Sequence, residues 1–329
     1  MEKKTSKIVI YWSKVFLISL LVVLIVRSFF IESYSVSSVQ METALLKGDR
    51  VLVNRTSYGI RMPVTILSIP FTFDSFLGMQ SYSSLINLGY HRLFGSEVES
   101  NDVVVFNNPM QREKPLDKRS LCISRCVAVS GDTVVVDGYN YLINGKRYVT
   151  SPDFLLRFKF QKDYTDTIKN IIAVLDIPLR NFSVKKDFAY TSFNRYEAFL
   201  LNQNLPDSLK IDLAEKEVSS YNIIIPKKGM KIKIDAINLP VYRSIFEQEC
   251  GDKLRIANNR IFVGGVEMPI YTFQYNYYWF LSDNVDESVD SRYVGFISEQ
   301  DIIGKASFIW YSSDDDSGIR WDRIFTQVK

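Results

Sequence analysis

The sequence predicts a mainly β protein, in which an antiparallel, barrel-like β ectodomain follows one N-terminal transmembrane helix and carries an α-containing insertion. Three observations predict this class: an apolar run near the start, two later blocks rich in alternating β-branched residues, and a helix-patterned segment between the blocks. A chain of 329 residues can form two modest domains, or one large domain with an insertion. Aromatic residues make up 14% of the chain and glycines number only 15, which excludes a disordered or low-complexity protein.

Residues 1–31 predict a short cytoplasmic start and a membrane anchor. Three lysines precede the run IVIYWSKVFLISLLVVLIVRSFFIE. Its uninterrupted centre, 15–26, spans about 18 Å as a helix, so crossing ~30 Å of hydrocarbon also requires the flanking residues. A cleaved secretory signal is the alternative, but bulky residues follow the run and we favour an uncleaved anchor. Because the lysines precede the span, we expect a cytoplasmic N-terminus and an outer location from Glu32 onward.

The sequence predicts a β core formed by residues 32–150 and 226–329, and a partly helical insertion at 151–225. The first block contains RVLVN, DVVVF and CVAVSGDTVVVDGYNYLINGKRY, and the second contains GMKIKIDAI, DKLRIANNRIFVGGVEMPIYTF and NYYWFLSDN. Between them, TDTIKNIIAVLDI has helical apolar spacing, as in Ile168 and Ile172.

The early segment IPFTFDSFLGM (69–79) brings four bulky apolar residues together on a loop-like stretch. Core packing is the default for them, and contact with the adjacent membrane surface is the alternative. These residues are Phe71, Phe73, Phe76 and Leu77.

The composition argues against several function classes. Lys and Arg total 40 against 37 Asp and Glu, and no dense basic stretch accompanies a stacking platform, so no nucleic-acid partner is predicted. Three cysteines without a CxxC spacing favour neither a disulfide framework nor a metal site, and we predict no metal and no cofactor. The single histidine, His91, would have to serve any Ser-His-Asp triad, and an ordinary surface or packing role fits it better.

Four stretches in order carry a family resemblance. They are QMETALLKGDRVLVNRTSYGIRMPVT, NDVVVFNNP, PLDKRSLCISRCVAVSGDTVVVDG with YLINGK, and SDNVDESVDSRYVGFISEQDIIGKASFIWYS. Together they resemble bacterial type I signal peptidase, an S26-type, membrane-anchored serine endopeptidase that removes signal peptides from exported proteins. The resemblance covers the anchor, 32–150 and roughly 226–325, and leaves out the insertion.

The resemblance implies a Ser-Lys dyad, and neither half is present here. The family's nucleophilic serine stands directly before the Met of a Ser-Met-x-x-Thr-Leu segment, where this chain has Gln40. Its lysine stands before Arg in a Lys-Arg-x-Val-x-x-x-Gly-Asp segment, where this chain has Ser124. A serine hydroxyl needs a base, and a lysine is that base only when desolvation lowers its pKa. A carboxamide cannot attack a peptide carbonyl, so no catalytic residue of the dyad is intact.

Relocated chemistry is the alternative to lost chemistry. Ser38 lies two residues upstream on the same strand face and resembles the family's side-chain oxyanion donor. Lys118 and Lys47 are the nearby lysines, but both stand in polar or turn-like stretches. Cys126 lacks an evident activating base and has the pattern of a packed strand residue.

The third segment is better preserved and predicts a retained site frame. Its members, together with Arg125, are Asp283, Asn284, Ser288, Asp290 and Arg292. In the family the serine helps to orient the lysine, and the Asp and Arg residues form a buried charge network. Ser282 replaces the family's glycine and adds bulk beside the place of the amine, while Val285 replaces an arginine.

We therefore predict a catalytically inactive signal peptidase I homologue in the bacterial cytoplasmic (inner) membrane, with a single span and a periplasmic main domain. The predicted partners are the membrane and either signal peptides of exported proteins or an active signal peptidase. A retained groove would hold an extended peptide by strand addition. Two alternatives stay open: an active signal peptidase with a rewired site, and a membrane-anchored interaction scaffold that binds through its insertion.

Overall fold

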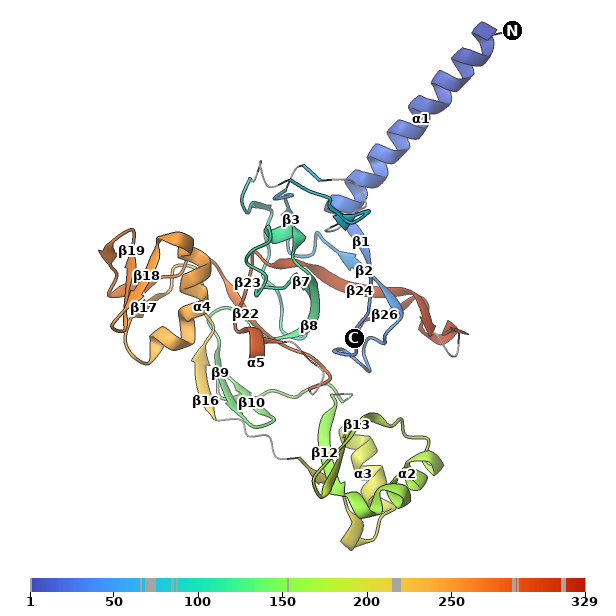
Figure 1. The fold of residues 1–329 in the computed structure, drawn as a ribbon, viewed down its shortest axis with the longest axis vertical. Helices are drawn as coiled ribbons and strands as arrows, with labels where there is room; N and C mark the ends of the chain where they lie inside the picture. Colours follow the sequence, from blue (N-terminus) through green and yellow to red (C-terminus); the bar gives the residue numbers. More distant parts are fainter. Residues whose placement is uncertain are drawn as a thin grey trace.

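The computed structural model describes residues 2–65, 67–68, 75–83, 86, 88–152, 154–214, 220–285, 288, 290–314 and 318–328. It confirms a mainly β protein with one long N-terminal helix. Helix α1 (Glu2–Phe29) projects away from the rest of the molecule (Figure 1). Its stretch Ile10–Phe29 is long and apolar enough to cross a membrane, and none of it is buried against the protein.

The core of the molecule is a curled antiparallel sheet. Its strands in the described residues are ordered β1-β2-β24-β7-β8-β22-β23, and two short strands, β25 and β26, also pair with β24. The bounds are β1 (Ile31–Ser35), β2 (Asp49–Asn54), β24 (Ile302–Asp314), β7 (Val103–Asn107), β8 (Leu121–Ala128), β22 (Tyr277–Leu281), β23 (Ile297–Ser298), β25 (Gly318–Ile319) and β26 (Thr326–Gln327).

Local sequence explains these strands. Burial alternates along β2, where Val51 and Val53 point into the core, while all five residues of β7 are buried because both faces of the sheet are covered. The Gly-Asp turn before β2 requires its glycine: Gly48 has φ +91°, and a Cβ there would stand 1.9 Å from the Ser313 carbonyl oxygen.

A second β lobe continues from β8. Its four-stranded sheet has the order β11-β10-β9-β16, with β9 (Thr133–Asp137), β10 (Asn140–Ile143), β11 (Lys146–Arg147) and β16 (Tyr221–Ile224). Smaller sheets pair β17 (Lys231–Lys233) with β21 (Ile270–Thr272), and β18 (Leu254–Ala257), β19 (Arg260–Val263) and β20 (Val266–Glu267) with each other. Helix α4 (Asn238–Cys250) packs on this lobe (Figure 1) and lies between stretches that the sequence predicted as strands.

Residues 154–214 form a separate α/β unit with its own hydrophobic core, which we call the insert unit. Its sheet has the order β13-β14-β12-β15, and it extends from the lower side of the molecule in Figure 1. The bounds are β12 (Leu156–Gln161), α2 (Thr165–Val174), β13 (Arg180–Lys185), β14 (Phe188–Phe193), α3 (Arg195–Gln203) and β15 (Asp212–Leu213). Ile168 and Ile172 form the buried face of α2. The limits 151–225 stay a prediction, and β16 near their end pairs with β9 rather than with the insert sheet.

Two short two-stranded sheets lie between β2 and β7 in the sequence: β3 (Ile60–Arg61) with β6 (Arg92–Leu93), and β4 (Ser75–Phe76) with β5 (Met79–Gln80). The predicted apolar loop falls here. Phe71, Phe73 and the Phe76 side chain lie outside the described residues, whereas the Leu77 side chain is 83% exposed and does not belong to the core.

Candidate functional site

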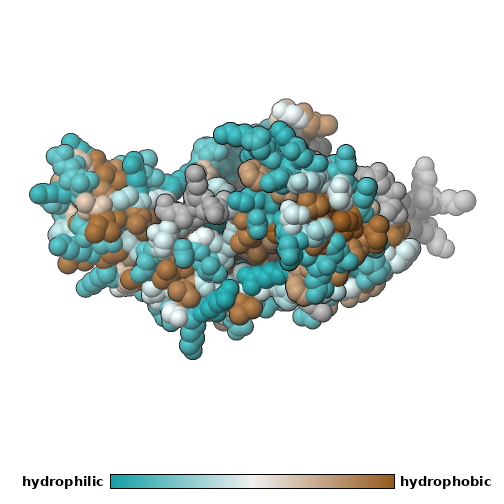
Figure 2. Space-filling view, turned by 90° about the horizontal axis from the view of Figure 1, so that it is seen from below, coloured by the Kyte–Doolittle hydropathy of each residue, from teal (hydrophilic) through white to brown (hydrophobic). Residues whose placement is uncertain are grey.

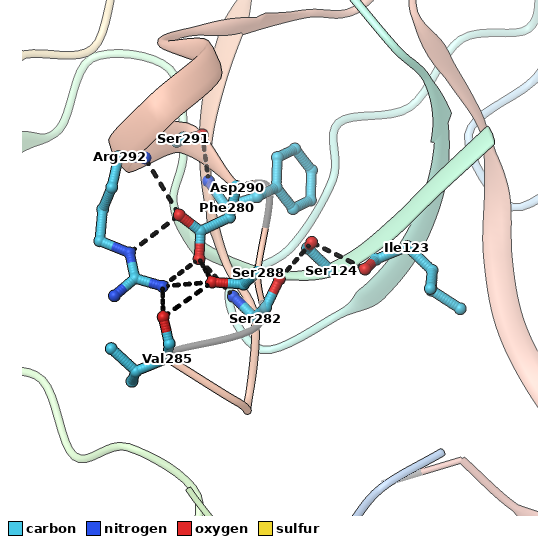
Figure 3. A network of polar contacts seen from close by, with 9 residues as sticks. All are labelled: Ile123, Ser124, Phe280, Ser282, Val285, Ser288, Asp290, Ser291 and Arg292. Carbon is cyan, nitrogen blue, oxygen red and sulfur yellow. Dashed lines mark hydrogen bonds and ion pairs between the residues drawn. The ribbon is translucent and has the colours of Figure 1, made fainter. Parts of the chain in front are cut away.

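Ser124, the predicted position of the family's lysine, lies in the middle of β8 and is completely buried. Its hydroxyl donates to the carbonyl oxygen of Ile123 at 2.7 Å and lies 2.9 Å from the hydroxyl of Ser282, which is also completely buried (Figure 3). The two serines therefore satisfy each other's hydrogen bonds in a space without solvent.

Gln40, the predicted position of the nucleophile, lies in the turn that follows β1. Its backbone carbonyl accepts a hydrogen bond from the Asn284 N–H at 2.9 Å. Among the residues that the structure describes, neither the Gln40 carboxamide nor the Ser38 hydroxyl has a hydrogen-bond partner. The segment 282–284 thus contacts both predicted dyad positions, Ser124 through Ser282 and Gln40 through Asn284.

Arg125 and Asp283 form a buried, two-pronged ion pair. The Arg125 guanidinium donates to the two carboxylate oxygens at 3.0 and 2.6 Å. The contact is set by the sheet, since Arg125 is the direct cross-strand partner of Leu281, two residues before Asp283. Paired donors and acceptors of this geometry form strong, oriented hydrogen bonds.

Asp290 organises the second half of the frame (Figure 3). Its carboxylate accepts hydrogen bonds from the Arg292 guanidinium at 2.8 and 2.6 Å, from the Ser282 N–H at 2.9 Å and from the Ser288 hydroxyl at 3.2 Å. Burial lowers the pKa of Arg292, but the hydrogen bonds and charge of Asp290 outweigh this effect and raise it. Asp290 also caps the short helix α5 (Ser291–Val294) by accepting from the Arg292 N–H.

The structure shows no polar contact among the candidates for a relocated dyad within the described residues. The Lys118 side chain is buried and its Nζ lies 5.6 Å from the centre of the Tyr82 ring, whereas Lys47 is exposed. Cys126 is completely buried, and burial raises the pKa of its thiol, so the thiolate is disfavoured. In the described part of the chain, no lysine makes an ion pair or hydrogen bond with Ser38 or Ser124.

Within the described residues, one edge of β8 has no strand partner beside the site. The Cys126 N–H and carbonyl both bond toward β7, to Asp102 and Asn101. Because backbone groups alternate along a strand, those of Leu121 and Ile123 face the opposite edge. On that edge β22 pairs with β8 only from Arg125 onward, so 121–124 extend past its end. Apolar residues of 34–41 and of this half of β8 share one buried cluster.

The insert unit contacts the site through residues that sequence reasoning missed. The Leu155 N–H donates to the Asp283 carbonyl at 2.8 Å, and the Asn181 amide donates to the Asn284 side chain at 3.3 Å. Arg180 lies 3.7 Å from the Glu42 carboxylate. Nothing in their local sequence distinguishes Leu155, Arg180 and Asn181 from other residues of an amphipathic α/β unit, so only the fold could identify them.

Comparisons with known proteins identify the family of the chain. A family model described as "Signal peptidase, peptidase S26" matches residues 9–209 and 271–311, which is more than half of the chain. These ranges include most of the predicted insertion and leave out 210–270.

Three relatives illustrate the extent of the similarity. Signal peptidase I of Haemophilus influenzae is 25% identical over 317 residues, which cover 94% of this chain and 73% of the relative. Signal peptidase I of Buchnera aphidicola subsp. Baizongia pistaciae is 26% identical over 318 residues, covering 93% and 79%. Signal peptidase I of Helicobacter pylori is 22% identical over 325 residues, covering 94% and 90%. The chain belongs to the signal peptidase family, peptidase S26.

Proposed function

We propose that this protein binds extended, signal-peptide-like segments at a signal peptidase groove and does not cleave them. The observation that carries the proposal is the buried pair of Ser124 and Ser282. Their hydroxyls lie 2.9 Å apart where the family places its amine, so this space holds no base. Gln40 adds the loss of the nucleophile, since a carboxamide oxygen does not form an acyl-enzyme.

The free edge of β8 supports peptide binding. Leu121 and Ile123 offer backbone donors and acceptors beside the segment 36–40, and an extended peptide can pair with such an edge as an added strand. Main-chain pairing of this kind supplies affinity, while the pockets under alternate side chains supply selectivity. The binding test compares a labelled signal peptide with a copy N-methylated at alternate residues. Loss of binding on methylation supports strand addition, and equal binding of both peptides contradicts it.

We predict no cleavage of a preprotein by the detergent-solubilised protein. Substrate and product are followed by intact-mass spectrometry, with an active signal peptidase I as the positive control. The matched variants are Ser38→Ala and Ser124→Ala, because these are the hydroxyls present in the site. Cleavage by the natural chain that either variant abolishes would establish a rewired peptidase and overturn the proposed inactivity.

We further propose that α1 anchors the protein in the bacterial cytoplasmic membrane with the main domain on the outer side. The exposed apolar surface of Ile10–Phe29 supports the anchor, and lysines before the span support this orientation. In spheroplasts, an added protease should digest the main domain and leave a cytoplasmic N-terminal tag intact. Protection of the main domain in intact spheroplasts, with digestion after lysis, would reverse the topology.

A further inference from the structure

The segment 282–284 connects the two sides of the proposed peptide groove and so defines its closed end. Ser282 contacts Ser124 in β8, and Asn284 contacts Gln40 in the turn after β1. A peptide paired along 121–124 therefore meets this segment when it continues past Gln40. Both Ser282 and Asn284 are completely buried, so other residues also cover this segment on the side that faces away from the proposed groove.

The cover is the insert unit. Leu155 pairs with Asn284 as a parallel β-bridge, and its N–H donates to the Asp283 carbonyl at 2.8 Å. The next residue, Val285, is 1% exposed and belongs to the buried cluster of the insert unit, together with Phe154 and Leu156. Val285, which replaces the family's arginine, thus connects the site frame to the hydrophobic core of the insert unit. An arginine side chain at this position would place a charge in that apolar cluster.

A second contact fixes the loop that carries Gln40. Arg180 lies between the carboxylates of Glu42, at 3.7 Å, and Glu197, at 2.8 Å, and so joins the loop to the insert unit. Glu42 also accepts from the Asn284 amide at 3.3 Å. Its neighbour Thr43 has φ +98°, a conformation that costs a β-branched residue energy and persists only where the surroundings hold it.

We propose that the insert unit is a lid docked over the closed end of the groove through Val285 and the Arg180–Glu42 pair. A peptide that continues past Gln40 binds only when this lid lifts, whereas a peptide that ends at Gln40 binds with the lid docked. The gating part of this inference depends on the proposed peptide binding, but the docking itself does not. Figure 2 views the molecule from the side of the insert unit, where hydrophilic residues surround scattered apolar patches.

The test uses the full-length protein in detergent and the variant Val285→Arg. The matched control is Val184→Arg, because Val184 lies on β13 of the same unit and is 52% exposed. Hydrogen exchange of the Leu155 amide reports docking, since its acceptor is Asp283. We expect exchange to become at least about tenfold faster in Val285→Arg and to stay unchanged in the control, because local opening sets the exchange rate.

The gating measurement follows the association of two labelled peptides, one that ends at the closed end of the groove and one that continues ten residues further. We expect Val285→Arg to speed association of the long peptide alone.

A second variant, Glu42→Gln, keeps the shape of Glu42 and removes its charge. It replaces Val285→Arg in the test if Val285→Arg does not fold. Its expected effect on Leu155 exchange is about five- to tenfold, as for a half-buried ion pair.

Unchanged Leu155 exchange in both variants would overturn the docked lid. Faster exchange with unchanged association of the long peptide would overturn its gating role. If neither peptide binds any form of the protein, the proposed function fails, while the exchange data alone still decide whether Val285 and Glu42 hold the insert unit in place.

Discussion

Replacing Asp290 with alanine is expected to lower the free energy of unfolding by about 3–5 kcal/mol, because it leaves a buried guanidinium without its counter-charge. Asp290 is completely buried and accepts hydrogen bonds from Arg292, Ser282 and Ser288. The substitution thus removes the counter-charge of the Arg292 guanidinium and the side-chain acceptor of the Ser282 and Arg292 N–H groups. Urea unfolding of the solubilised protein, followed by the fluorescence of the buried Trp279 among the chain's tryptophans, measures the change.

The control for Asp290→Ala is Asp207→Ala. Asp207 also pairs with a cation, Lys210, but its side chain is 93% exposed, and solvent screens the pair. We expect no measurable change in the urea midpoint for this control. A loss below about 1 kcal/mol in Asp290→Ala, the range of an exposed pair, would mean that the Asp290 network is open to water and does not form the buried frame described above.

Local patterns of the sequence were sufficient to predict the broad fold. The apolar run predicted α1, the β-branched stretches predicted β7, β8 and β9, and the spacing of Ile168 and Ile172 predicted α2. Helix α4 was not predicted, because it lies inside a block whose flanking stretches alternate as strands. Its buried residues Leu239, Tyr242 and Phe246 do follow a helical repeat, which a shorter window would have detected.

The candidate site, like the fold, was predictable from local sequence only in part, because some of its contacts join residues that are far apart in the chain. Family segments alone predicted Gln40, Ser124 and the frame residues as site positions, since each follows from a short motif. The bulk of Ser282 beside the predicted amine position also followed from the motif, but its hydrogen bond to Ser124 joins residues 158 positions apart in the sequence and appears only in the fold. Contacts with the insert unit, such as Arg180 with Glu42, depend on tertiary docking that no residue pattern encodes.

Three substitutions together are expected to restore cleavage: Gln40→Ser, Ser124→Lys and Ser282→Gly. The first supplies a hydroxyl, the second supplies a base, and the third removes the side chain that now contacts Ser124 at 2.9 Å. Because position 124 is completely buried, desolvation should lower the pKa of the introduced lysine and leave part of it neutral near pH 8. Ser288, already held by Asp290 and Arg292, lies in the retained frame that would orient the amine.

The matched comparison is the double variant Gln40→Ser with Ser282→Gly, which has the nucleophile and the space but no base. We expect the triple variant to process a preprotein about 10²–10⁴-fold faster than this double variant, the usual contribution of a positioned general base. The rate should rise with pH through the lysine's pKa, because only the neutral amine accepts the serine proton. Single-turnover cleavage measured from pH 6 to 10 checks both expectations.

Failure of the triple variant is informative when folding and peptide binding are measured on the same sample. A triple variant that unfolds at the same urea concentration as the natural chain, binds the short peptide and still does not cleave would show that the Gln40 loop cannot present a nucleophile to the groove. The loop is held by the strained backbone of Thr43 and by the ion pair between Glu42 and Arg180. Adding Glu42→Gln to the triple variant removes that ion pair and so distinguishes a misplaced loop from an ineffective base. Cleavage that appears only after this fourth change would place the remaining defect in the loop.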